Sequence, residues 1–143
     1  MRNGFTIIEL ILVVAIVALI AALSSPFYSR FLLQNSVDNT TNQLLGSLRK
    51  AQTYAMAGKQ TSAWSVNFSS NTITLYMGTT FAGHDATYDE TFSVNPAVSV
   101  SGMTDISYAR ITGLPTPTSA TITISSGNNN ETITLNSQGV VNR

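Results

Sequence analysis

Residues 1–28, MRNGFTIIELILVVAIVALIAALSSPFY, contain the apolar run that decides the fold. From Phe5 to Leu23 this run carries one charged side chain, the carboxylate of Glu9. As a helix that rises 1.5 Å per residue, the run would reach roughly 28 Å, close to the thickness of the hydrocarbon core of a bilayer. A charged residue costs about 2.5–3.5 kcal/mol at the centre of a membrane span and somewhat less near its end. Glu9 is therefore expected to need a partner that neutralises it.

Length and composition limit the classes of protein that the chain can represent. The 143 residues suffice for one domain, or for a long appendage and a domain with its own core. Seven basic and seven acidic side chains give zero formal charge, which argues against the broad positive field of a nucleic-acid binder. Charged residues make up 10% of the chain, and Ser, Thr and Asn replace them, which suits a β-rich extracytoplasmic surface. The absence of cysteine excludes disulfides and thiolate metal sites.

Three interpretations of the N-terminal segment are open from its hydropathy alone. A secretory signal peptide would use Arg2 as its charged region, Leu10 to Leu23 as its apolar region and Ala22-Leu23-Ser24 as its cleavage site. A plain signal anchor is the second interpretation. A buried core helix is the third, and it is disfavoured because a globular domain rarely hides so unbroken an apolar run.

The stretch GFTIIEL, residues 4–10, contains a combination that neither a signal peptide nor an anchor explains. With its short leader and single basic residue, it resembles the class III signal of type IV pilins and type II secretion pseudopilins. The resemblance implies that a prepilin peptidase cleaves between Gly4 and Phe5 and methylates the new N-terminal Phe5. It also implies that Glu9 is the glutamate that serves assembly, by pairing with the Phe5 amine of a neighbouring subunit. Pro26 falls where many pilins carry a helix-breaking proline.

The predicted fold class is α+β, with a long N-terminal helix followed by an antiparallel β domain of the pilin type. The expected parts are a leader at 1–4, a transmembrane and filament-core helix at 5–25, an amphipathic helix at 26–58 and a β-rich globular domain at 59–143. Pro26 has no backbone donor and disfavours helix at Ser25. We therefore expect a kink or a locally melted turn at residues 24–26.

Helical spacing of apolar residues predicts that the second half of the helix packs on a sheet. The residues of this stripe are Val37, Leu44, Leu48, Ala51 and Ala55. Polar residues occupy much of the remaining helix surface: Asp38, Asn42, Arg49, Lys50 and Gln52. Gly58 is a suitable residue to terminate the helix, so its end is expected near Ala57.

Alternation of apolar and polar residues predicts strands after the helix. The clearest hairpin has Trp64, Val66 and Phe68 on one strand, Ile73, Leu75 and Met77 on the other, and Ser69-Ser70-Asn71 as its turn. Further strands are expected at 91–94, 98–100, 106–111, 120–124, 132–135 and 140–141, with a loop at Ser125–Glu131 between two of them. A looser resemblance links SLRKAQTYAMAGKQ (47–60), WSVNF (64–68) and TITLNSQGVV (132–141) to the minor pseudopilin H and FimT-like group, which implies two facing sheets.

Two groups of polar residues within 84–90 are candidate sites of chemistry. His84 beside Asp85 supplies ingredients of a catalytic triad, but no G-x-S-x-G is present, and a solvated loop histidine is the favoured interpretation. Asp85, Asp89 and Glu90 offer oxygen ligands for calcium without the spacing of an EF-hand, so whether this loop binds calcium stays open. We expect no catalytic residue, no cofactor and no metal site.

The sequence predicts a structural subunit of an extracytoplasmic filament, and the substrate of an enzyme rather than an enzyme. Its expected partners are other pilin or pseudopilin subunits through the N-terminal helix, the prepilin peptidase, and the inner membrane, which the helix would cross once before assembly into a periplasmic or cell-surface filament. The alternative is a secreted or anchored β-rich binding module released near Ser24. A DNA-uptake minor pilin is a further alternative, although nucleic acid is not expected because only Lys59, Arg110 and Arg143 are basic after the helix. The machine, the subunit's position in it and its cargo or adhesion target stay open.

Overall fold

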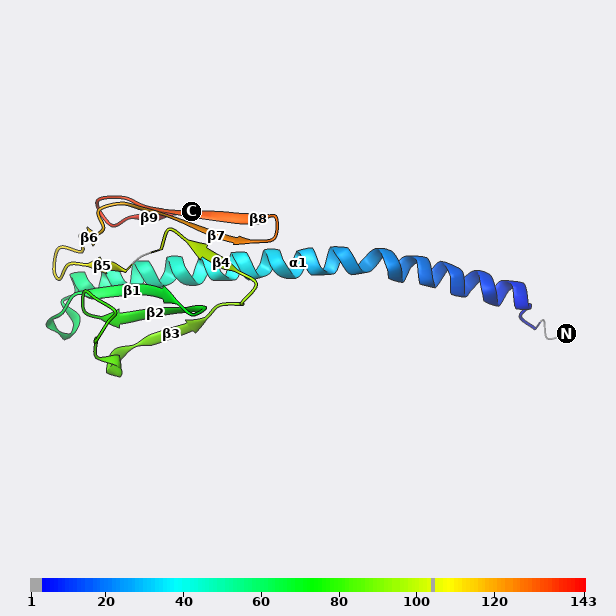
Figure 1. Ribbon diagram of the computed structural model, residues 1–143, viewed down its shortest axis with the longest axis horizontal. Helices are drawn as coiled ribbons and strands as arrows, with labels where there is room; N and C mark the ends of the chain where they lie inside the picture. The colour runs from blue at the N-terminus through cyan, green and yellow to red at the C-terminus, as the bar shows by residue number, and fades with distance from the viewer. Residues whose placement is uncertain (1–3, 104) are drawn as a thin grey trace. The chain divides into compact units, whose positions relative to one another are not determined.

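The structure consists of one long helix followed by antiparallel strands (Figure 1). The computed structural model describes residues 4–103 and 105–143, and within residues 23–27 it describes the backbone without the side chains. Helix α1 spans Ile7–Met56, and strands β1 to β9 follow it. The chain divides into two compact units, Met1–Leu32 and Leu33–Arg143. The predicted α+β class, a long N-terminal helix followed by antiparallel sheets, is confirmed.

The first unit contains the N-terminal part of α1, which is assigned without interruption from Ile7 onward. The backbone stays helical through residues 24–26, so the predicted melted turn there is wrong. The predicted kink at Pro26 and the alternative cleavage after Ser24 fall within residues 23–27, whose side chains are not described, and both stay predictions. Within the part of the chain that the structure describes, no helix combines the length and the apolarity needed to cross a membrane.

In the second unit, α1 buries the apolar stripe that its sequence predicts. The five stripe residues, Val37, Leu44, Leu48, Ala51 and Ala55, are all fully buried. The helix ends at Met56, one residue before the predicted end. Gly58 has φ 62° and ψ 26°, a left-handed conformation that glycine adopts without steric cost, and its N–H donates to Ala55 O at 3.0 Å. The short 3₁₀ helix η1 (Lys59–Thr61) follows.

One sheet contains five strands in the order β3-β2-β1-β5-β6. Their bounds are β1 Trp64–Ser69, β2 Thr72–Met77, β3 Glu90–Ser93, β5 Ile106–Tyr108 and β6 Pro115–Thr116. The predicted hairpin of β1 and β2 is confirmed, with Val66 opposite Leu75 and a two-residue turn at Ser70 and Asn71, both at positive φ. Strand β5 ends three residues before the predicted Ile111, because the chain there turns back at residues 109–114.

A second sheet contains four strands in the order β4-β7-β8-β9. Their bounds are β4 Ser99–Ser101, β7 Ala120–Ser126, β8 Asn129–Leu135 and β9 Val141–Asn142. The predicted loop at Ser125–Glu131 is wrong in extent. Ser125 pairs with Asn130 and Ser126 with Asn129, so the strands extend to a two-residue turn, where Gly127 takes a φ of 59°.

The core of the second unit lies between the helix stripe and the two sheets. The five-stranded sheet contributes Trp64, Val66, Ile73, Leu75 and Ile106, and the four-stranded sheet contributes Ile122, Ile124, Ile133, Leu135 and Val141. Tyr76 lies between Leu75 and Met77 on β2, so its side chain points to the opposite face of the sheet from Leu75. Tyr76 is nevertheless fully buried, which means that another part of the chain covers that face.

Candidate functional site

The residues singled out for processing and assembly lie at the start of α1. Gly4, Phe5 and Thr6 precede the helix, and Glu9 lies in its first turn. The Glu9 Oε2 atom accepts hydrogen bonds from the Thr6 backbone N–H at 3.3 Å and from the Thr6 hydroxyl at 3.1 Å. The Glu9 N–H lies 3.4 Å from the Thr6 hydroxyl oxygen, which accepts it. This reciprocal arrangement is a capping box, in which two N–H groups at the helix start are satisfied.

The capping box gives Glu9 a role within its own chain. A carboxylate in the first turn also interacts favourably with the positive end of the helix dipole. Thr6 is part of the GFTIIEL motif, and the resemblance assigns it no function. The signal was available, because a threonine followed three residues later by a glutamate, ahead of an apolar run, is the sequence pattern of a capping box.

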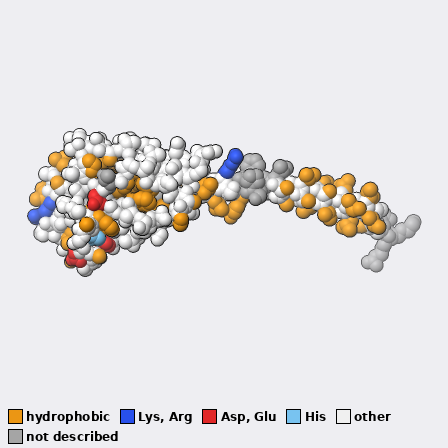
Figure 2. Space-filling view, in the orientation of Figure 1, with side chains coloured by type: hydrophobic (Ala, Val, Ile, Leu, Met, Phe, Trp, Pro, Cys, Tyr) orange, Lys and Arg blue, Asp and Glu red, His pale blue; other side chains and the backbone are white. Residues whose placement is uncertain are grey.

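Around this capped start, the first unit exposes large apolar side chains along α1. Phe5 is 83% exposed, and the others are Ile7, Ile8, Leu10, Ile11, Leu12, Val13, Val14, Ile16, Val17, Leu19 and Ile20. Consecutive residues of a helix point to different sides, so this apolar surface surrounds the helix instead of forming one stripe. In Figure 2, hydrophobic side chains dominate the visible surface of this unit. A contiguous apolar surface of this kind indicates contact with lipid or with other protein chains.

The folded chain itself does not require a glycine at position 4. A Cβ atom built at Gly4 meets nothing within 4 Å. Any need for glycine at this position would therefore come from a protein that recognises the segment.

His84 differs from the solvated loop histidine favoured from the sequence. Its side chain is only 11% exposed. Its Nδ1 lies 2.5 Å from Phe81 O, and its Nε2 lies 2.8 Å from Asp89 Oδ2. The ring stacks on Phe81 and contacts Tyr76, each with a centroid distance of 4.8 Å. The hydrogen bond to the Asp89 carboxylate, aided by the Phe81 carbonyl, raises the pKa of His84 above its ordinary value. No periodicity in the loop sequence could have predicted this burial, because it results from packing on the sheet.

The three acidic residues considered for calcium have separate partners. Asp85 accepts hydrogen bonds from the N–H and hydroxyl of Thr87, which lower the pKa of Asp85. Asp89 contacts His84, and Glu90 forms an ion pair with Lys50 at 2.5 Å. Among residues 4–103 and 105–143, no group of three carboxylate or histidine side chains could hold a metal ion.

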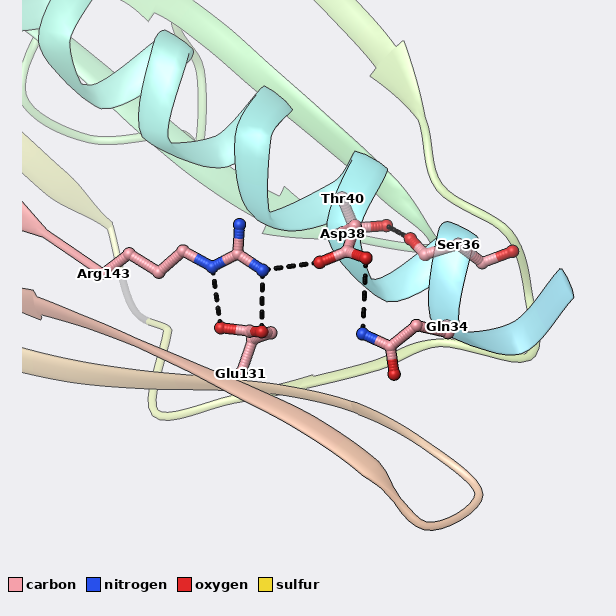
Figure 3. Close-up of polar contacts among 6 residues, drawn as sticks. All are labelled: Gln34, Ser36, Asp38, Thr40, Glu131 and Arg143. Atoms are coloured by element: carbon pink, nitrogen blue, oxygen red, sulfur yellow. Dashed lines mark hydrogen bonds and ion pairs between the residues drawn. The ribbon is translucent and has the colours of Figure 1, made fainter. Parts of the chain in front are cut away.

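Two of the three basic residues considered for nucleic acid are engaged within the second unit. Lys59 Nζ lies 3.6 Å from the centroid of the Tyr54 ring, a cation–π contact. Arg143 makes a two-pronged contact with Glu131, at 2.8 Å and 2.7 Å, and its Nη2 also donates to Asp38 on α1 (Figure 3). These bonds lower the pKa of Glu131 and raise that of Arg143.

Asp38 connects this network back along the helix. Its second oxygen accepts from the Gln34 side chain at 3.3 Å, as Figure 3 shows. The arrangement joins the C-terminal strand region, β8 and α1 through charged groups on the domain surface. It is a structural contact between Arg143 and the helix. The positive charge of Arg143 is therefore already paired and is less available to attract a phosphate.

Comparison with known proteins supports the sequence resemblance. The prokaryotic N-terminal methylation motif matches residues 1–25. The chain is also 28% identical over 90 residues to the type IV major fimbrial protein FimA of Dichelobacter nodosus. That match covers 62% of this chain and 56% of the relative, so the match spans about half of the relative's length. No solved structure matches the chain. The resemblance to type IV pilins and pseudopilins predicted from GFTIIEL is confirmed, whereas the narrower minor pseudopilin H and FimT-like group is not.

Proposed function

We propose that the chain is a structural subunit of a filament of the type IV pilus or type II secretion kind. The observation that carries this proposal is the apolar segment of the first unit, whose side chains from Phe5 to Ile20 are exposed on all sides within the stretch that matches the methylation motif. Such a surface is stable only when lipid or other apolar chains cover it. A filament core of parallel helices would supply that cover after the helix leaves the membrane, because contact between apolar helices would replace contact between the helix and lipid.

Processing is proposed to occur between Gly4 and Phe5, with N-methylation of Phe5. Both residues precede the helix and are exposed, so the backbone at the scissile bond is open to a peptidase. Glycine suits a close approach of enzyme to backbone because it has no Cβ. The expected enzyme is a prepilin peptidase at the cytoplasmic face of the inner membrane, and the subunit would cross that membrane once before assembly into a periplasmic or cell-surface filament.

Assembly is proposed to depend on Glu9. Cleavage would create a positive amine on Phe5, and a charged amine is as unfavourable in an apolar core as the carboxylate itself. Pairing between Glu9 of one subunit and the Phe5 amine of its neighbour would neutralise both groups. It would also fix the axial register of apolar helices that could otherwise slide, the role for which buried polar contacts are best attested.

Mass spectrometry of the N-terminal peptide from native cells tests the proposal. The expected peptide begins with N-methylated Phe5, and the expected location of the processed chain is a filament fraction sheared from cells or a periplasmic pseudopilus. An unmodified N-terminus at Ser25 would overturn the proposal and support a β-rich binding module released by signal peptidase near Ser24. Retention of Met1 to Gly4 in cells that carry an active prepilin peptidase would support a plain membrane anchor.

A further inference from the structure

The loop between β2 and β3, residues 78–89, packs on the outer face of β2, and we call it the cover loop. It includes the 3₁₀ helix η2 (Ala86–Tyr88). Phe81 and His84 of this loop contact the ring of Tyr76, with centroid distances of 5.4 Å and 4.8 Å. Because Tyr76 points away from the helix side of the sheet, these contacts explain why it is fully buried. The cover loop is therefore the lid over this part of the sheet's outer face.

Hydrogen bonds hold the loop to the neighbouring strands at one place and close it on itself at another. Asp105 accepts from the Phe81 N–H at 3.1 Å and from the Asn67 side chain at 2.5 Å, which ties the loop to β1. His84 closes the loop on itself, because it bridges Phe81 O and the Asp89 carboxylate, which both belong to the loop. Gly78 and Gly83 both have positive φ, at 122° and 77°, so the backbone on either side of Phe81 takes conformations that favour glycine.

Both partners of His84 are hydrogen-bond acceptors. A neutral imidazole has one N–H donor and one acceptor nitrogen, so it can bond to only one of the two. The other contact would then place two acceptors against each other. Both contacts are satisfied only when the pair of His84 and Asp89 holds one additional proton, either as an imidazolium beside a carboxylate or as a neutral ring beside a carboxylic acid. The closed geometry, with distances of 2.5 Å and 2.8 Å, therefore requires that proton.

We propose that His84 is a proton-dependent latch that keeps the cover loop closed over Tyr76, and that loss of its proton breaks the bridge within the loop and loosens the packing of the His84 ring on Tyr76. Opening would expose the ring of Tyr76 on the outer face of the domain, while Asp105 keeps the Phe81 backbone attached. The surface offered to a partner would then be aromatic above the transition and covered below it. This device does not depend on the processing or assembly proposed for the N-terminal helix.

The charged groups around His84 are consistent with a latch of this kind. On the loop, Asp89 is its direct partner, while Asp85 is bonded to Thr87. On β2, Tyr76 stays neutral because burial raises its pKa to about 12. The remaining charged groups nearby have partners other than His84: Asp105 accepts from Asn67 and from the Phe81 N–H, and Glu90 pairs with Lys50.

The sign of the pH dependence follows from this environment. Asp89 and the Phe81 carbonyl raise the pKa of His84 in the folded chain above the ordinary value of 6.5. The closed loop is therefore fully stabilised below that ordinary value, and the stabilisation is lost as pH rises through the folded-state pKa. Each unit by which the folded-state pKa exceeds the ordinary value should change the opening equilibrium about tenfold.

The experiment uses the full chain in detergent micelles, which cover the apolar part of its helix. The single histidine of the chain gives one imidazole signal. NMR of histidine labelled with nitrogen-15 would follow both ring nitrogens through a pH titration. Hydrogen–deuterium exchange of peptides from residues 78–89, normalised to the intrinsic rate at each pH, would report loop opening. We expect protection of the loop to fall with the same midpoint as the His84 titration, above pH 6.5. A titration at or below the ordinary value, or protection that does not vary with pH, would overturn the latch.

Asp89→Asn separates a latch from a merely structural contact. The introduced carboxamide can donate to a neutral His84 Nε2 while Nδ1–H still donates to Phe81 O, so both contacts survive without the additional proton. We expect the loop in this variant to stay protected across the whole range and the pKa of His84 to fall. Asp85→Asn is the matched control, since it removes a neighbouring carboxylate that does not contact His84, and it should keep the pH-dependent opening. Opening of Asp89→Asn at every pH, or a flat profile in Asp85→Asn, would contradict the proposal.

Discussion

Thr6 and Glu9 bond each other reciprocally across the first turn of α1, with the Glu9 carboxylate 3.3 Å from the Thr6 N–H and the Thr6 hydroxyl 3.4 Å from the Glu9 N–H. The Glu9 carboxylate, which we propose to pair with the Phe5 amine of a neighbouring subunit, thus already has a function in its own chain. Loss of a helix N-cap typically costs about 0.5–2 kcal/mol. A substitution at Glu9 can therefore act through its charge, through the cap, or through both.

Substitutions at these two residues separate the charge of Glu9 from its cap. Glu9→Leu removes both, whereas Glu9→Gln keeps a side chain that can complete a capping box. Leaving one partner of a buried pair uncompensated typically costs about 3–5 kcal/mol. We expect Glu9→Leu to be cleaved after Gly4 but severely depleted from sheared filaments, and Glu9→Gln to be depleted less completely. The measurement is the ratio of processed protein in membranes to that in filaments.

Thr6→Ala is the matched variant, because it disrupts the cap and keeps the carboxylate. It should enter filaments at close to the normal level if the charge of Glu9 is what assembly requires. Wild-type incorporation of Glu9→Leu would rule out the pairing as an assembly requirement, and it would favour a tip position without a preceding neighbour or the plain anchor.

Gly4→Leu is expected to block processing without disturbing the fold. A Cβ at Gly4 would meet nothing within 4 Å, so the defect should lie in recognition by the peptidase. Immunoblots of membranes should show the full-length precursor. Gly46→Leu is the control, because Gly46 is an exposed helical glycine whose Cβ would also meet nothing within 4 Å, and this variant should be processed normally. Removal of Met1 to Gly4 from the Gly4→Leu variant would contradict the assigned cleavage site.

The elements that the sequence predicts are those whose signal is local and periodic. The helix stripe from Val37 to Ala55 and the hairpin around Ser70 and Asn71 each repeat with the period of one kind of structure, and each is observed. Strand β6, at Pro115–Thr116, has only two residues and no period to detect. The capping box of Thr6 and Glu9 had a recognisable sequence pattern but was not identified.

Contacts between distant residues had no such signal. Arg143 and Asp38 are 105 residues apart in the sequence, and only the folded domain brings them together. The burial of His84 likewise depends on the cover loop packing against Tyr76, and the loop residues alone resemble a solvated turn. Side-chain partners of this kind follow from tertiary packing, so composition and spacing cannot supply them.

Arg143→Gln is expected to lower the thermal stability of the domain modestly in low salt at neutral pH. The variant loses the contacts of Arg143 with Glu131 and Asp38, which are exposed and therefore screened by salt. Because Arg143 lowers the pKa of Glu131, the stabilisation is present above the ordinary value of 4.5 and is lost as pH falls through the folded-state pKa. Thermal melts of both proteins should therefore converge in acid and in high salt.

Arg110→Gln is the control for this comparison. Within the described part of the chain, no ion pair of Arg110 is found, so its loss should leave the melting temperature unchanged under all these conditions. An equal loss of stability in both variants would indicate a general effect of net charge instead of the specific network.

Ile111→Asn is expected to stabilise the second unit. Ile111 has a φ of 72° while its N–H donates to Ala55 O at 2.9 Å, so the turn after β5 holds a β-branched residue in the left-handed region. That conformation costs an ordinary residue roughly 1–2 kcal/mol, and asparagine tolerates it better. The side chain is 67% exposed, so its replacement removes little buried apolar surface. We expect the free energy of unfolding to rise by about 1 kcal/mol.

Urea denaturation of the full chain in one detergent should show a higher midpoint with an unchanged slope. Leu114→Asn, in the same turn, 45% exposed and without a positive φ, is the matched control and should be neutral or destabilising. A midpoint for Ile111→Asn that equals or falls below the wild-type value would show that the turn does not strain Ile111.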